Sequence, residues 1–242
     1  MNTMMKTTAV VGLCLSTLSG AHAAISLDRT RVIFNGGDKS MTLNIANDNK
    51  QLPYLAQAWL EDARQTKITT GPIVVTPPVQ RLEPGVKSLL RLSTTPDIAK
   101  LPQDRESLFY FNLREIPPRS EKANSLQIAL QTRVKLFYRP ASIKTKPNAV
   151  WQDKLVLTKE SGGYRIENPT PYFITVIGIG EGAKQTQVGK FEAVMLAPKS
   201  SQSVKAGNYN APVLTYINDY GGRPSLTFQC SSNRCTAVET DK

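Results

Sequence analysis

The side chains available for chemistry exclude many classes of enzyme. The only histidine of the 242-residue sequence, His22, lies in an N-terminal leader, so the chain after the leader has none. This excludes a Ser-His-Asp triad, a Cys-His pair and a histidine-ligated zinc, but not carboxylate-only or Ser-Lys chemistry. The sequence also has no Gly-rich phosphate loop, nucleophile elbow or metal-ligand spacing. We therefore expect no enzyme, no cofactor and no metal.

Two acidic residues near arginines are the remaining candidates for acid–base chemistry. Glu106 follows Arg105, and Asp219 lies shortly before Arg223. Pairs of carboxylates are catalytic in glycosidases. On a β scaffold a salt bridge is the commoner use of such residues. A buried arginine between two acids would fix geometry more than it would add stability.

Two cations are candidates for binding. By pattern alone, Arg31 and Lys135 are two solvated charges on different strands. They could instead converge on a carboxylate, to which the arginine fork can donate two charge-assisted hydrogen bonds. Both interpretations stay open at the level of pattern.

Ser125–Lys135 is the stretch whose pattern bears most on function. Leu126, Ile128 and Leu130 alternate with other residues, so in a strand they form one apolar row about 13 Å long, at ~3.3 Å per residue. Alternation alone favours a row that packs on the protein's own core. The other interpretation is a row offered to another chain.

Residues 1–23 have the features of a secretory signal peptide. Lys6 precedes the mostly apolar run Thr7–Leu18, and Ala21-His22-Ala23 supplies small residues before a cut at Ala24. The run is too short for a lasting membrane span of ~20 residues, so we expect an exported protein that is not membrane-embedded. The cut removes one cation and no acid, which lowers the formal net charge from +11 to +10. Export argues against nucleic acid as the partner, and a basic surface suits an acidic protein.

Two cysteines remain after the cut, because Cys14 leaves with the leader. Cys230 and Cys235 lie five positions apart, after a predicted strand. In an oxidising compartment this spacing predicts a disulfide across a hairpin or loop end. Metal binding would need two further ligands, and none is obvious.

The fold class follows from short β-rich runs separated by turn residues. Seven or eight such runs precede Tyr138, with no long helical period, which predicts an all-β immunoglobulin-like sandwich. Pro140–Pro147 has the composition of a linker. The β pattern then resumes to the end of the chain. We expect a signal peptide over 1–23 and domains over 24–143 and 144–242.

Long motifs resemble one known family, the periplasmic chaperones of chaperone–usher pili. The resemblance covers essentially the whole chain after the leader. The motifs that carry it are Ser26–Arg31 (SLDRTR), Asn47–Leu55 (NDNKQLPYL), Leu101–Glu115 (LPQDRESLFYFNLRE), Lys135–Pro140 (KLFYRP), Asn168–Tyr172 (NPTPY) and Tyr216–Gly222 (YINDYGG).

The resemblance implies two immunoglobulin-like domains at an angle with a cleft between them. It implies that Arg31 and Lys135 anchor the C-terminal carboxylate of a pilus subunit. Leu126, Ile128 and Leu130 match the row that the family lends to a subunit whose own fold lacks a strand. The short connection Ile116–Asn124 matches the short-loop subfamily, in which a C-terminal cysteine pair belongs.

The family also implies roles outside the subunit contact. Glu106, Arg139 and Asp219 match its buried interdomain charged cluster. Pro53 and Arg91 are weaker candidates for the face that meets the outer-membrane usher. An exposed apolar strand edge also favours self-association, so a self-capping homodimer is a candidate state of the free protein.

The alternative function is a secreted β-sandwich binding module, such as a carbohydrate-binding adhesin. Phe109-Tyr110-Phe111 could stack on sugars, although core packing is the commoner use of such a cluster. A histidine-free hydrolase is a third and weaker alternative.

Overall fold

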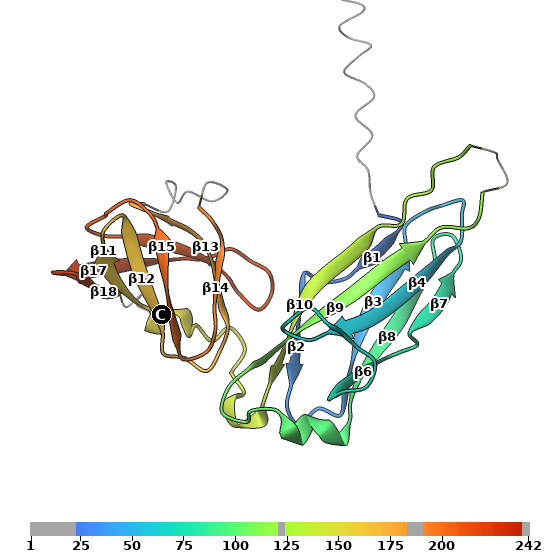
Figure 1. Ribbon diagram of the computed structural model, residues 1–242, viewed down its shortest axis with the longest axis horizontal. Helices are drawn as coiled ribbons and strands as arrows, with labels where there is room; N and C mark the ends of the chain where they lie inside the picture. Colours follow the sequence, from blue (N-terminus) through green and yellow to red (C-terminus); the bar gives the residue numbers. More distant parts are fainter. Residues whose placement is uncertain (1–22, 121–123, 183–190, 239–242) are drawn as a thin grey trace, which may run out of the picture.

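The computed structural model describes residues 23–120, 124–182 and 191–238 (Figure 1). The predicted signal peptide therefore lies outside the described residues, except for Ala23. Within the described ranges the chain is all β apart from the short 3-10 helices η2 (Pro96–Lys100), η3 (Ala141–Ile143) and η4 (Gln152–Lys154). No helix of this described part is long and apolar enough to cross a membrane.

The N-terminal unit is a sandwich of two sheets. One sheet has the strand order β1-β3-β8-β6, and the other has the order β2-β10-β9-β4-β5, with β7 also pairing with β4. All pairs are antiparallel except β2 with β10. The strands are β1 (Ile25–Leu27), β2 (Arg31–Asn35), β3 (Ser40–Asn47), β4 (Tyr54–Glu61), β5 (Lys67–Ile68), β6 (Ile73–Thr76), β7 (Val79–Leu82), β8 (Lys87–Thr94), β9 (Ser107–Ile116) and β10 (Gln131–Arg139).

The C-terminal unit has the strand order β14-β13-β16-β17-β18-β11-β12-β15. Strand β17 pairs with β16 through its first three residues and with β18 through its last four, so it passes from one layer to the other. The strands are β11 (Val156–Glu160), β12 (Gly163–Asn168), β13 (Ile174–Gly180), β14 (Val194–Leu196), β15 (Ser200–Lys205), β16 (Val213–Ile217), β17 (Ser225–Ser231) and β18 (Arg234–Ala237).

Each unit has its own hydrophobic core. Phe34, Leu90 and Phe111 are fully buried in the first, and Tyr164 and Phe228 in the second. The two clusters share no residue, as expected of two domains. The chain passes between the units through η3 and η4, and the units meet at an angle (Figure 1). The predicted all-β, two-domain architecture is confirmed.

The predicted strand Ser125–Lys135 begins later than expected. Strand β10 starts at Gln131, and residues 125–130 belong to no strand. In the β9–β10 register, Gln131 lies opposite Arg114, so residues 127 and 128 would face Pro118 and Pro117. Proline has no N–H to donate, so the ladder cannot continue. Two contacts tie the segment back: the Glu115 N–H donates to the Leu130 carbonyl at 3.0 Å, and Gln127 Nε2 donates to the Pro118 carbonyl.

The predicted disulfide is present between Cys230 and Cys235. The two cysteines are directly paired residues of the β17–β18 hairpin. The bond therefore closes the end of a two-stranded unit that the sheet already holds together.

We predict that replacing both cysteines by serine costs the C-terminal unit about 2 kcal/mol, because the bond closes a loop with a sequence separation of only 5. Calorimetry should show a lower unfolding temperature for that unit and an unchanged one for the N-terminal unit. Reductant added to the double variant is the control and should have no further effect. A loss that spreads to the N-terminal unit would contradict the prediction.

Candidate functional site

Arg31 and Lys135 are brought together by the parallel pair of strands. Arg31 opens β2, Lys135 lies in β10, and the two residues are direct partners in the register. Lys135 points away from the core, whereas its neighbours Val134 and Leu136 are buried in it. The β9–β10 register runs without a shift from Gln131 to Tyr138. Lys135 is therefore out of phase with the apolar row because it lies on the other face of the sheet.

Neither cation has a carboxylate partner among the residues that the structure describes. Arg31 Nη1 donates to the Ile217 carbonyl at 3.3 Å, and Lys135 Nζ lies 3.5 Å from Thr175 Oγ1. Arg31 Nε is buried without a hydrogen-bond partner. Across the described ranges, no acid forms an ion pair with either residue. Neutral groups of the C-terminal unit thus position the pair, and within the described ranges acids act on Arg31 without forming an ion pair.

Burial makes both charges costly. Desolvation lowers the pKa of Arg31, although Asp219 and Glu106 oppose the effect. Desolvation also lowers the pKa of Lys135, and the positive charge of Arg31 lowers it further. An anion bound between them would relieve both effects, and a carboxylate can accept from both side chains at once. The arrangement suits anion binding.

A charged cluster joins the two units beside this pair. Arg139, the last residue of β10, contacts Glu106 at 2.7 Å and Asp219 of the C-terminal unit at 2.8 Å. The second oxygen of Glu106 accepts from the Phe173 N–H at 2.7 Å. Burial raises the pKa of Glu106 to about 7, although Arg139 and the Phe173 N–H act in the opposite direction.

Aromatic rings complete the cluster. The guanidinium carbon of Arg139 lies 4.9 Å from the ring centroid of Trp151 and 5.0 Å from that of Tyr172. The Tyr172 hydroxyl donates to the Ile143 carbonyl at 2.7 Å. Such cation–π contacts attract a buried guanidinium and hold it in place.

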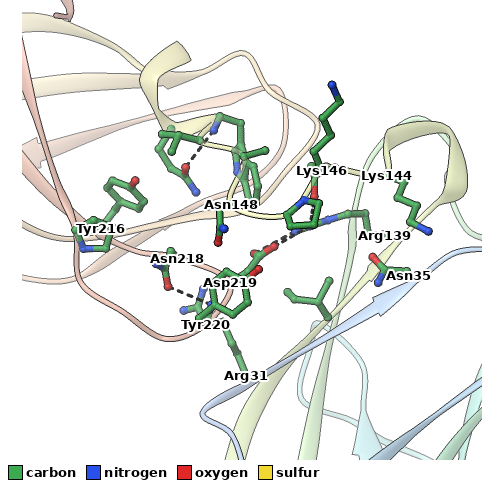
Figure 2. A pocket seen from close by; sticks show the side chains of 18 of the residues that line it. Arg31, Asn35, Arg139, Lys144, Lys146, Asn148, Tyr216, Asn218, Asp219 and Tyr220 are labelled. Carbon is green, nitrogen blue, oxygen red and sulfur yellow. Dashed lines mark hydrogen bonds and ion pairs between the residues drawn. The ribbon is translucent and has the colours of Figure 1, made fainter. Parts of the chain in front are cut away.

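A cavity of about 650 Å³ lies at this junction. Its walls come from β2, from the connection around η3 and η4, and from the turn after β16. Figure 2 shows Arg31, Arg139 and Asp219 facing one another across it, with Tyr220 beside them. The residues that line it come from both units, so the cleft is shared between the two domains.

The apolar row is exposed. Leu126, Ile128 and Leu130 have 88%, 63% and 42% of their surface exposed, and the backbone around them belongs to no strand. The interpretation from alternation alone, that the row packs on the protein's own core, is therefore wrong. The interpretation as a row accessible to another chain agrees with the structure.

Pro53 and Arg91 lie on different sheets of the N-terminal unit. Pro53 directly precedes β4, next to the exposed Leu55. Arg91 is exposed on β8, donates to Ser40 Oγ at 2.8 Å and pairs with Thr76. Pro77-Pro78 and the exposed Val79 follow Thr76.

The sequence interpretation missed the contributions of the C-terminal unit. Thr175, Phe173, Ile217, Trp151 and Tyr172 all contact the charged residues of the N-terminal unit or their neighbours. Each contact spans at least 12 residues of sequence between separate β units. Local alternation therefore carries no signal of them.

The fold and the site define a two-domain immunoglobulin-like binding protein with a cationic cleft and an unpaired apolar segment. The chain belongs to the family of pilus-assembly chaperones. Residues 24–144 match the family "Pili and flagellar-assembly chaperone, PapD N-terminal domain", and residues 150–228 match "Pili assembly chaperone PapD, C-terminal domain".

Individual relatives support membership of the same family. The chain is 72% identical over 222 residues to chaperone protein PapD of Escherichia coli, which covers 92% of this chain and 93% of that protein. The structure of the periplasmic chaperone SfaE is 32% identical with a TM-score of 0.68, covering 84% of this chain and 98% of that one. A chain of the Salmonella enterica SafA pilin–SafB chaperone complex is 26% identical with a TM-score of 0.72, covering 88% and 99%. The protein is thus a periplasmic chaperone of pilus assembly and not an enzyme.

We predict that Glu106 makes stability depend on pH. Its pKa is about 7 in the folded state and 4.5 for an unperturbed glutamate, so between these values the folded state keeps a proton that the unfolded state has lost. This contribution is complete below about pH 4.5 and is lost as the pH rises through 7. It amounts to at most about 3 kcal/mol.

Glu106→Gln should remove this slope, measured as the difference between urea midpoints at pH 5 and pH 8. Glu83→Gln, which changes an exposed acid of the same unit, is the matched control and should keep the wild-type slope. An unchanged slope in Glu106→Gln would contradict the assignment.

Proposed function

We propose that the chaperone captures pilus subunits by adding its segment 126–130 as a strand to a subunit fold that lacks one. The observation that carries the proposal is the exposure of Leu126, Ile128 and Leu130 on a backbone that belongs to no strand. Main-chain hydrogen bonds would give affinity for many subunits, and the three side chains would fill the open core. The SafA–SafB relative is a complex of a chaperone with a pilin, which supports this use.

The three side chains have enough apolar surface to matter. Burying a Leu or Ile side chain is worth roughly 1.5–3 kcal/mol. Three of them contribute on the order of 5–9 kcal/mol before the entropy cost of association. A shift of one residue would turn the row away from the subunit core, so the complex needs a second element that fixes the register.

Arg31 and Lys135 supply that element by anchoring the C-terminal carboxylate of the subunit. They are adjacent, partly buried and without an acid partner in the described part of the chain. Glu106, Arg139 and Asp219 serve the anchor indirectly, because their cluster ties the two units that form the cleft.

Further steps follow from the same assignment. The chaperone delivers its subunit to the outer-membrane usher through a face that includes Pro53 and Arg91, next to the exposed Leu55 and Val79. Release occurs by strand exchange with the next subunit. The free protein covers its apolar row in a homodimer.

Signal cleavage after Ala23 leaves domains over 24–143 and 144–242.

We predict that Arg31→Ala and Lys135→Ala leave a folded protein that loses subunits. Hydrogen bonds to charged groups are worth about 1.5–3 kcal/mol each, so each variant should bind at least 10-fold more weakly. The measurement is co-purification of subunits co-expressed in the periplasm, with the bound protein identified by mass spectrometry. Arg165→Ala, an exposed arginine of β12, is the control. Normal yield with either cleft variant would refute the anchor.

We predict that Ile128→Glu abolishes capture with little change in the melting temperature of the free protein. The side chain is 63% exposed, so the free protein should change by no more than about 0.5 kcal/mol. In the complex the charge would be buried in the core of the subunit. Leu89→Glu, at a position 55% exposed on β8, is the matched control and should capture normally. A large loss of stability in free Ile128→Glu would mean that the row serves the chaperone's own fold.

A further inference from the structure

Glu115 is a buried acid that the proposed function does not use. Its side chain is 6% exposed, on β9 of the N-terminal unit. One carboxylate oxygen accepts from the Ile25 N–H at 2.9 Å. Over residues 23–120, 124–182 and 191–238, no lysine or arginine forms an ion pair with it. A carboxylate buried with a backbone donor but no cation is costly.

The residues that follow the predicted cleavage position are fixed against this acid. Ala24 and Ile25 are 8% and 2% exposed. The Ala24 carbonyl accepts from the Asp48 N–H at 2.7 Å, and Ile25 pairs with Asn47 in the β1–β3 ladder. Successive backbone nitrogens are about 3.5 Å apart. The Ala24 nitrogen therefore lies within roughly 6 Å of the Glu115 carboxylate, close enough for a strong interaction between opposite charges.

We propose that Glu115 is the binding site for the α-ammonium group that signal cleavage creates at Ala24. Hydrolysis of the Ala23–Ala24 peptide bond by signal peptidase places the hydroxyl of water on Ala23 and leaves an amine on Ala24. The amine is protonated near neutral pH. Before cleavage the same position holds a neutral amide. Processing thus supplies the missing cation, at a residue that the fold buries near Glu115.

The backbone of Glu115 also contacts the base of the exposed segment. The Glu115 N–H donates to the carbonyl of Leu130, the last residue before β10. The mature N-terminus, Glu115 and the base of segment 126–130 therefore form one continuous group. The cleavage position at Ala24 and this link to the segment both rest on the proposed function.

Other charged side chains lie near Ala24, and one of them, Asp48, serves as the control carboxylate. The hollow beside Ala23 and Ile25 is also lined by Arg29, Asp48 and Arg133. Arg29 pairs with Asp28, and Arg133 pairs with Glu61. Asp48 is exposed and is the competing carboxylate for the new ammonium.

The test is a double-mutant cycle, measured by melting temperature, on the full exported chain. Inserting Gly-Ser-Gly between Ala23 and Ala24 moves the ammonium about 10 Å along the chain and leaves an amide N–H at Ala24. Glu115→Gln keeps an oxygen that can accept from Ile25 but removes the charge. Intact mass first confirms that the unmodified chain begins at Ala24.

Each change should lower the melting temperature of the N-terminal unit by roughly 3–8 °C. Both together should lower it no more than the larger single change, because they remove one interaction. Asp48→Asn combined with the insertion should give additive effects. Additive losses for Glu115→Gln with the insertion, no effect of the insertion, or a mature chain that begins elsewhere would overturn the site.

A second measurement covers the case in which Glu115→Gln does not accumulate. Titration of the Ala24 α-amino group in the unmodified protein, followed by NMR, should give a pKa above the ordinary 7.7–8.0. An ordinary value would overturn the proposal. Subunit capture by the unmodified protein and its loss in Arg31→Ala are measured in the same preparations, so failure of this site and failure of the proposed function are distinguishable.

Discussion

The buried contact of Arg139 with Glu106 and Asp219 is the interaction on which the rest of the site depends. It ends β10 and ties the two units; Arg139 and Glu106 have almost no access to water, whereas Asp219 is partly exposed. Trp151 and Tyr172 hold the guanidinium from its faces. Four residues earlier on the same strand, Lys135 reaches Thr175 of the other unit. A change in the angle between the units would therefore change the surroundings of the anchor cations directly.

The exposed row depends on a different constraint, the lack of a neighbour in the sheet. Strand β9 ends before Pro117-Pro118, and β2 begins only at Arg31, opposite Lys135. Residues 28–30 leave toward the other sheet, where the Asp28 N–H donates to the Asn44 carbonyl. Beyond the bond from the Glu115 N–H to the Leu130 carbonyl, residues 126–129 belong to no strand of the described chain. Under the proposed function their backbone pairs with another chain instead.

The sequence was sufficient for features that arise locally. Alternation and turn residues predicted most strands, and the spacing of Cys230 and Cys235 predicted their bond. Alternation gave the phase of Leu126, Ile128 and Leu130 but favoured the wrong environment, because exposure depends on whether a neighbouring strand exists. The adjacency of Arg31 and Lys135 depends on a parallel pairing across about a hundred residues. Resemblance to a family supplied the exposed use of the row and the joint role of Arg31 and Lys135. The groups on the C-terminal unit that position the two cations were found only in the structure.

The parallel register of β2 and β10 determines the distance between the cation pair and the apolar row. It fixes the cation pair five residues from Leu130 along one continuous chain, about 16 Å at ~3.3 Å per residue. Under the proposed function, a bound subunit is positioned by counting back from its last residue. The part of the subunit that precedes these last residues is free to vary in length and composition. One chaperone of this design can therefore serve a set of unlike clients, provided that they share the way they end.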